Sequence, residues 1–111
     1  MQTTRVKRTE EILKIVDKIV AAVAPEKIIL FGSHAEERAG HHSDIDLLII
    51  WDTQLDAAER MRCISRLIRP RPAPLDIVVK TPAEIRRSRQ RVDPFLSEIL
   101  EKGAVLYARP R

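Results

Sequence analysis

Short apolar runs of strand character alternate with helical patterns along this chain, and this alternation constrains its fold most strongly. Residues 28–31, 45–51 and 75–79 are rich in β-branched and large apolar side chains, as buried strands are. Helices that alternate with short strands predict an α/β (α+β) fold in which helices flank a sheet. Only about a dozen residues join the first two strands, too few for a full parallel crossover, so we expect a short mixed sheet.

The first two helices are indicated by the spacing of apolar residues and by turn signals. Residues 9–24 place their apolar side chains on one helical stripe, which Pro25 ends. Thr53, followed three residues later by Asp56, predicts the N-terminal cap of a second helix, and Pro70 breaks that helix.

The last third of the chain carries stronger helix boundaries. Thr81, with Glu84 three residues on and a proline between them, combines a cap, a first-turn proline and a capping glutamate. Pro94 opens a short final helix, and Gly103 is placed to end it. The residues that follow, 104–107, predict a closing strand.

The composition fits one globular domain of 111 residues, with a core at about residues 9–108. Hydrophobic residues make up 44% and charged residues 32%, which excludes a disordered chain. The apolar run at residues 47–51 is far shorter than the roughly 20 residues needed to cross a membrane, so no membrane association is expected. Cys63 is the only cysteine, so no internal disulfide can form and a cytoplasmic location is expected.

The formal net charge of +4 indicates either an anionic partner or a solvated basic surface. Two groups of arginines, within residues 60–71 and 86–91, could contact phosphates or an acidic protein, or could be solvated helix faces. Because the chain has only four aromatic residues, a base-stacking platform is not expected, and direct RNA binding is not favoured.

Two aspartates open the second predicted strand. Asp44 and Asp46 are two residues apart, so their carboxylates lie on the same face, with α-carbons about 6–7 Å apart. Such like charges repel each other unless a cation lies between them, and Mg²⁺ prefers carboxylate and phosphate oxygens. The pair therefore suits a metal-bound nucleoside triphosphate, although an Asp-x-Asp sequence is more often solvated or capping.

A third aspartate and a Gly–Ser pair add to this pattern. Asp76 interrupts the apolar residues of the third strand, where an unpaired buried carboxylate would be costly. It either joins the first two aspartates or faces water on an edge strand. Gly32 and Ser33 directly follow the first strand, and together they allow close backbone approach and hydroxyl donation to phosphate oxygens.

These segments resemble the signature of the DNA polymerase β-like nucleotidyltransferase superfamily. The matching residues are Phe-Gly-Ser-His-Ala at 31–35 and Ser-Asp-Ile-Asp-Leu-Leu at 43–48. The small size and the ending, from Asp93 and Phe95 to Tyr107, are similar to MNT-type minimal members of the superfamily, which are stand-alone catalytic domains.

The resemblance implies that Asp44, Asp46 and Asp76 are catalytic and hold two Mg²⁺ ions, while Gly32 and Ser33 hold the phosphates of ATP. It also implies that AMP is transferred to a hydroxyl, with Asp76 helping to deprotonate the acceptor. In a chain this short we expect no second domain for the acceptor. The resemblance therefore implies a partner, a HEPN toxin that accepts AMP on a tyrosine, with this chain as its antitoxin.

The chain departs from the family pattern at Glu36 and Glu37, where Arg and Gly are usual. Two added negative charges near a triphosphate favour an alternative, an antitoxin with weak or no catalysis that neutralises its partner by binding alone. Three histidines that flank the motif, His34, His41 and His42, are interpreted as loop residues rather than metal ligands.

Overall fold

Helices and strands alternate as the sequence predicts. The computed structural model describes residues 4–32, 45–70, 74–91 and 93–110. In chain order the elements are α1 (Thr4–Val23), β1 (Lys27–Phe31), β2 (Ile45–Ile50), α2 (Ala57–Leu67), β3 (Leu75–Lys80), α3 (Pro82–Arg91), α4 (Pro94–Lys102) and β4 (Ala104–Ala108). No helix within these ranges is both long and apolar enough to cross a membrane.

The strands form one mixed sheet in the order β3-β2-β1-β4. β1 is antiparallel to both β2 and β4, whereas β2 and β3 are parallel and are connected through α2. The short connection between β1 and β2 therefore joins antiparallel strands, and the predicted mixed sheet is confirmed. Because β2 runs antiparallel to β1 and parallel to β3, the end of β1 lies beside the starts of β2 and β3.

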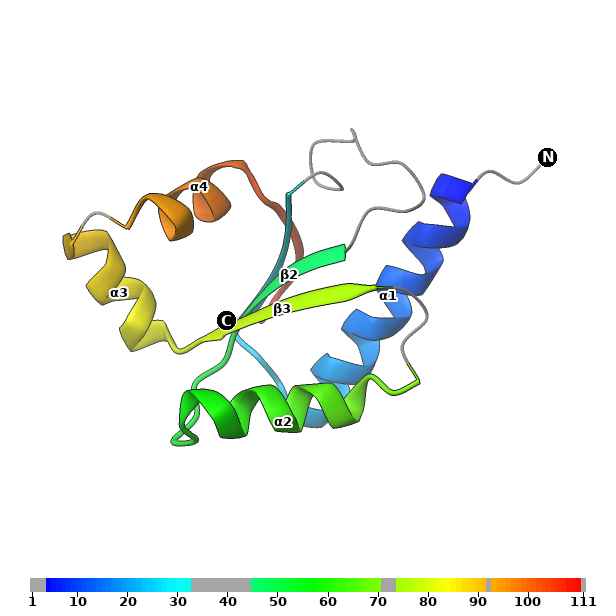
Figure 1. The fold of residues 1–111 in the computed structure, drawn as a ribbon, viewed down its shortest axis with the longest axis horizontal. Helices are drawn as coiled ribbons and strands as arrows, with labels where there is room; N and C mark the ends of the chain where they lie inside the picture. The colour runs from blue at the N-terminus through cyan, green and yellow to red at the C-terminus, as the bar shows by residue number, and fades with distance from the viewer. Residues whose placement is uncertain (1–3, 33–44, 71–73, 92, 111) are drawn as a thin grey trace.

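Two helical layers cover the sheet: α1 and α2 lie on one side, and α3 and α4 on the other (Figure 1). Alternate residues of each strand therefore face two different cores. The core under α1 and α2 contains Ile12, Ile15, Val16, Ile19, Ile28, Leu30, Ile45, Leu47, Ile49, Ile64, Ile68, Leu75 and Val79. The smaller core under α3 and α4 contains Ile29, Leu48, Ile50, Ile85, Leu96 and Ile99.

The predicted start of the second helix is wrong by three residues, because α2 is capped by Asp56 and not by Thr53. The Asp56 carboxylate accepts a hydrogen bond from the Glu59 N–H at 2.9 Å, and the Glu59 side chain accepts one from the Asp56 N–H at 3.2 Å. This reciprocal pair satisfies two backbone donors at once. In the predicted pair, Asp56 would have to accept from the Thr53 N–H, and its side chain is shorter than the glutamate that usually does so. The Thr53 hydroxyl instead accepts a hydrogen bond from the Leu55 N–H at 3.2 Å.

The starts of α3 and α4 are as predicted. Thr81 Oγ1 accepts from the Glu84 N–H at 3.2 Å, and Glu84 Oε1 accepts from the Thr81 N–H at 2.8 Å. Asp93 caps α4 by accepting from the N–H groups of Phe95 and Leu96, at 3.1 and 3.2 Å. These caps fix where the two helices begin above the sheet, and thereby where their side chains meet it.

Candidate functional site

Two of the three predicted aspartates lie next to each other on neighbouring strands. Asp46, the second residue of β2, is the register partner of Asp76, the second residue of β3. Because parallel partners about 4.8 Å apart share their pleat, the two side chains point to the same face of the sheet. Leu48, two residues after Asp46, belongs to the core under α3 and α4, so this is the face that those helices cover.

Asp76 is exposed, and Asp46 is half-buried. Because β3 is an edge strand of the sheet, the carboxylate of Asp76 is not desolvated, in line with the alternative of an edge-strand aspartate that faces water. An aspartate facing water is also an ordinary feature of an edge strand. The exposure nevertheless leaves the Asp76 oxygens open to a molecule that approaches from solvent.

Gly32 brings the backbone against the same pair. It follows β1 with a φ of +77°, in the left-handed region where side chains are strained. A Cβ built on Gly32 would lie 2.5 Å from Oδ2 of Asp46, so a side chain here would displace that carboxylate. Glycine at this position is therefore required both by the turn and by the close approach of the Asp46 carboxylate to the backbone.

Two predicted site residues, Ser33 and Asp44, lie outside the described residues, as do Glu36 and Glu37. The roles suggested for them stay predictions. Within the described ranges, no three His, Cys, Asp or Glu residues group as metal ligands. The described part supplies two carboxylates on one face, and such oxygens fit Mg²⁺, which commonly takes one or two carboxylates and completes its shell with water and phosphate.

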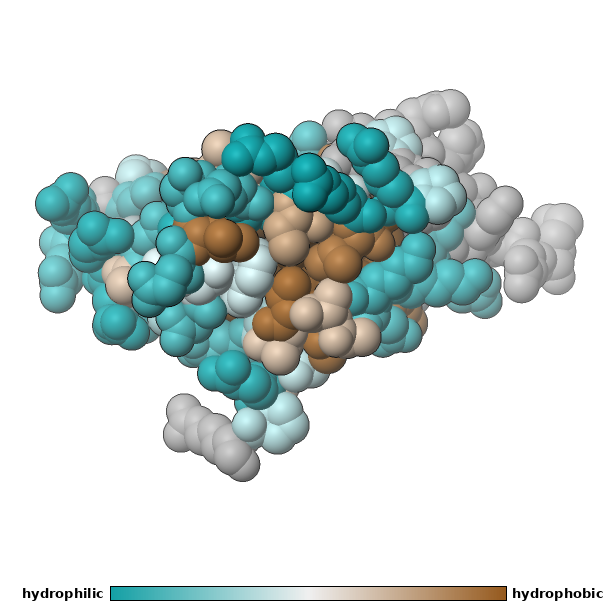
Figure 2. Space-filling model, turned by 90° about the horizontal axis from the view of Figure 1, so that it is seen from below, coloured by the Kyte–Doolittle hydropathy of each residue, from teal (hydrophilic) through white to brown (hydrophobic). Residues whose placement is uncertain are grey.

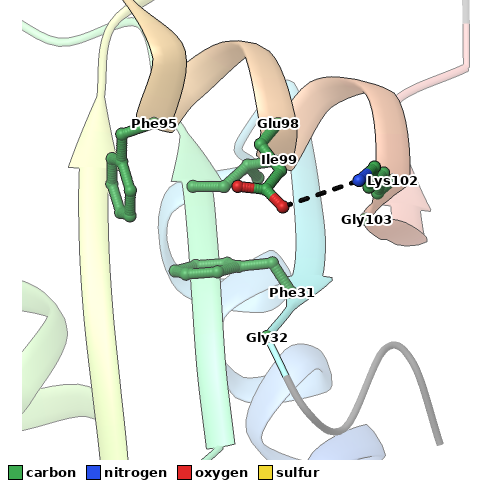
Figure 3. A pocket seen from close by; sticks show the side chains of 7 residues that line it. All are labelled: Phe31, Gly32, Phe95, Glu98, Ile99, Lys102 and Gly103. Carbon is green, nitrogen blue, oxygen red and sulfur yellow. Dashed lines mark ion pairs between the residues drawn. The ribbon is translucent and has the colours of Figure 1, made fainter.

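A pocket adjoins Gly32, between the end of β1 and α4 (Figure 3). It has a volume of about 260 Å³ and is lined by Phe31, Gly32, Phe95, Glu98, Ile99, Lys102 and Gly103. The rings of Phe31 and Phe95 meet edge to face, with centroids 5.9 Å apart and an interplanar angle of 87°. Figure 3 shows Glu98 and Ile99 on α4 near the Phe31 ring, with Lys102 further along the helix.

The far end of the pocket depends on a second glycine. The Gly103 N–H donates to the Ile99 carbonyl at 2.8 Å and ends α4 in extended conformation, with φ −71°. A Cβ at Gly103 would collide with the Ile29 side chain and with the Ile99 carbonyl oxygen. Glycine is therefore needed here for close packing of the helix end on β1, and not for a left-handed turn.

Residues 10–111 match the protein family described as "Polymerase beta, Nucleotidyltransferase". The chain belongs to this family. No curated protein matches its sequence. The family and the fold agree with the resemblance seen in the Gly–Ser and Asp-x-Asp segments.

Solved structures share this nucleotidyltransferase fold. A Sulfolobus solfataricus protein assigned as a nucleotidyltransferase is 23% identical, with a TM-score of 0.64 over 98% of this chain and 91% of that one. The toxin–antitoxin MntA–HepT is 20% identical, with a TM-score of 0.58 over 90% of this chain and 72% of that one. A toxin–antitoxin with AMP-PNP is 21% identical, with a TM-score of 0.59 over 86% and 72%. At these identities the likeness concerns the fold.

The pocket of this nucleotidyltransferase domain was missed by sequence reasoning. Phe31 and Phe95 are far apart in the sequence and meet only because α4 packs beside the end of β1. The scarcity of aromatic residues argued against a stacking surface, yet two of the four are in contact next to Gly32. The one available signal was the position of Phe31 directly before the Gly–Ser pair.

Arg60 is a buried structural residue and not part of a phosphate-binding surface. Its guanidinium donates from Nη1 to Glu84 Oε1 at 2.8 Å and from Nε to the Leu55 carbonyl at 2.8 Å. Burial by itself would raise the pKa of Glu84, but the hydrogen bond from the Thr81 N–H and the charge of Arg60 outweigh it and lower that pKa. The pair joins α2 to α3 across the edge of β3.

Proposed function

We propose that this chain is a Mg²⁺-dependent nucleotidyltransferase that transfers AMP from ATP to a tyrosine hydroxyl of a HEPN toxin, and that it acts as the antitoxin. One observation carries the proposal: Gly32, Asp46 and Asp76 meet at one end of the sheet, in a chain of the polymerase β nucleotidyltransferase family. These are the described members of the predicted site, although they come from three different strands or strand ends.

Each described residue has a part that follows from its position. Gly32 has no side chain, so its backbone lies directly against the half-buried Asp46, and its N–H would be close to a phosphate bound beside that carboxylate. Asp46 and Asp76, with Asp44 as the predicted third carboxylate, would hold Mg²⁺, which would neutralise charge at the reacting phosphate. Asp76 is exposed to solvent, and in this proposal its carboxylate would accept the proton of an incoming hydroxyl.

Three observations support a protein as the acceptor: an exposed aspartate, an apolar surface patch and the structures of the same fold. Asp76 is exposed in the described part of the chain, so a hydroxyl of a partner protein could approach it from solvent. Viewed from the side of α2, the surface shows apolar residues gathered in the middle of a hydrophilic rim, as at many protein interfaces (Figure 2). The MntA–HepT structures of the same fold are toxin–antitoxin structures, which supports a toxin as the partner.

Labelling of the partner tests the proposal. The chain is mixed with the HEPN protein encoded beside it, Mg²⁺ and ATP labelled at the α-phosphate. We expect label on the partner with the wild-type chain, and none after Asp46→Asn or after the Asp44→Ala, Asp46→Ala double substitution. Asp52→Asn is the matched control, because Asp52 is exposed beyond the far end of β2.

A different result would favour the alternative function. If the wild-type chain inhibits its partner but leaves it unlabelled, enzymatic transfer is ruled out and the chain is an antitoxin that acts by binding alone. Replacing the acceptor tyrosine of the partner with phenylalanine separates a tyrosine acceptor from other hydroxyls.

A further inference from the structure

We propose that the pocket between α4 and the end of β1 binds the nucleoside of the substrate, a purine base with its ribose. The inference rests on the proposed function, because it assumes a nucleoside triphosphate whose phosphates lie at Gly32. It assigns a binding role to Phe31, Phe95, Glu98 and Lys102.

The first argument is position, because Gly32 lies at both the carboxylate site and the pocket. Its α-carbon faces the carboxylate of Asp46, and the same residue lines the pocket. A ligand whose phosphates contact the Gly32 backbone beside Asp46 therefore has its other end within reach of the pocket. Two other hollows in the described part, one at the junction of β3, α3 and α4 and one on α2, include neither Gly32 nor either aspartate.

Size and lining are the second argument. Pockets for drug-sized ligands measure about 300–1,000 Å³, and this one, at about 260 Å³, suits part of a nucleotide rather than all of it. Its walls include the aliphatic Ile99 and two aromatic rings, which offer apolar surface to a flat base. Phe95 is 54% exposed, so much of its ring is free to stack on a ligand.

The polar rim is the third argument. Lys102 Nζ lies 3.7 Å from Glu98 Oε1, and their side chains are 62% and 67% exposed. Such an exposed pair is weak, so both groups are free to contact a ligand. The Glu98 carboxylate can accept hydrogen bonds from ribose hydroxyls or a base amino group, and the Lys102 ammonium can attract a phosphate.

Two probes separate the nucleoside pocket from the phosphate site. Binding of ATP and of inorganic tripolyphosphate is measured by calorimetry, each with Mg²⁺, on the full chain. We expect ATP to bind more tightly than tripolyphosphate. We expect Phe95→Ala to lower the affinity for ATP about tenfold, since stacking on an aromatic ring contributes on that scale. The affinity for tripolyphosphate should be unchanged.

The controls use the same chain. Val105→Ala removes an apolar side chain that is 55% exposed on β4 and does not line the pocket, so ATP affinity stays at the wild-type value. Phe95→Trp keeps a stacking surface and should retain the affinity for ATP. Lys102→Ala should lower the affinity for ATP. Thermal unfolding of each variant verifies that it is folded.

The outcomes distinguish the two proposals. Suppose that both probes bind, but that ATP binds no more tightly than tripolyphosphate or that its affinity is unaffected by Phe95→Ala. The nucleoside pocket is then disproved, while the phosphate site stands. If neither probe binds, the proposed function fails and the pocket inference fails with it. If Phe95→Ala lowers the affinities for ATP and tripolyphosphate equally, the inference is also overturned, because the substitution then has a general effect on the phosphate site.

Discussion

The α-carbon of Gly32 faces the carboxylate of Asp46 so closely that a Cβ at residue 32 would lie 2.5 Å from Oδ2. The backbone that follows β1 and the carboxylate near the start of β2 are thus held together without any side chain between them. Phe31, the residue before Gly32, is the register partner of Asp46, so the antiparallel pairing of β1 and β2 sets this approach.

We expect Gly32→Ala to lower the free energy of unfolding by about 1–3 kcal/mol, because an alanine is strained at a φ of +77° and its methyl group collides with the carboxylate. Urea denaturation measures the change. Combining Gly32→Ala with Asp46→Ala removes the collision but not the backbone strain, so part of the loss is recovered. A loss that is the same with and without the carboxylate would show that the contact has no energetic effect.

The second prediction concerns the paired carboxylates and metal. Asp46 and Asp76 are directly opposite on neighbouring strands, where like charges repel. Mg²⁺ should relieve that repulsion, so we expect Mg²⁺ to raise the melting temperature of the wild-type chain and EDTA to reverse the effect. Asp46→Asn and Asp76→Asn should each reduce the increase, whereas Asp52→Asn should not. An increase of the same size in all four proteins would place metal binding elsewhere.

The third prediction concerns the buried pair that joins α2 to α3. Arg60→Ala removes a guanidinium that bonds Glu84 and the Leu55 carbonyl, and we expect it to reduce stability by about 1.5–3 kcal/mol. The partly exposed Glu84 can regain water, which keeps the loss below that of a fully buried pair. Arg62→Ala, at an exposed position of the same helix, should change stability by no more than about 0.5 kcal/mol. Equal losses in the two variants would argue against a structural role for Arg60.

The fourth prediction is a loss of stability in acid. The pKa of Asp56 is lowered, chiefly by the hydrogen bond from the Glu59 N–H, and the pKa of Glu84 is lowered despite its burial. Because both folded-state values lie below the ordinary ones, their contribution is present above about pH 4.5 and is lost as the pH falls through the folded-state values.

Denaturation at a series of pH values between 2 and 6 measures this loss. Glu84→Gln and Asp56→Asn remove the titrating groups, and asparagine still caps a helix. The two variants together should show a shallower fall in stability below about pH 4.5 than the wild-type chain. An unchanged slope would mean that other carboxyl groups cause the acid sensitivity.

Local signals predicted much of this fold, because the elements are marked by their own residues. The cap at Thr81, the final helix from Pro94 and the mixed sheet were found in this way. The cap at Thr53 was misplaced, since Asp56 with Glu59 forms a better reciprocal pair than the spacing alone suggests. Strand edges are not visible in sequence, which is why the sequence left open whether Asp76 joins the other aspartates or faces water.

The candidate site was predicted in part. Gly32, Asp46 and Asp76 were identified by residue type and spacing, and the sheet brings them together. The pocket was not identified, because it forms only when two segments that are far apart in the sequence pack together. Arg60 was taken for a surface residue, since only the tertiary structure shows that Glu84 lies against it.

The pairing of β1 with β4 makes part of the site depend on segments that are synthesised after both described aspartates. A ribosome releases β1, β2 and β3 first, and these carry Gly32 and both described aspartates. The wall formed by Phe95, Glu98 and Lys102 exists only after α4 has emerged and β4 has added to the sheet. A nascent chain that ends before α4 would therefore have its acidic pair but no pocket, and nucleotide capture in the pocket would have to wait until α4 and β4 have been made.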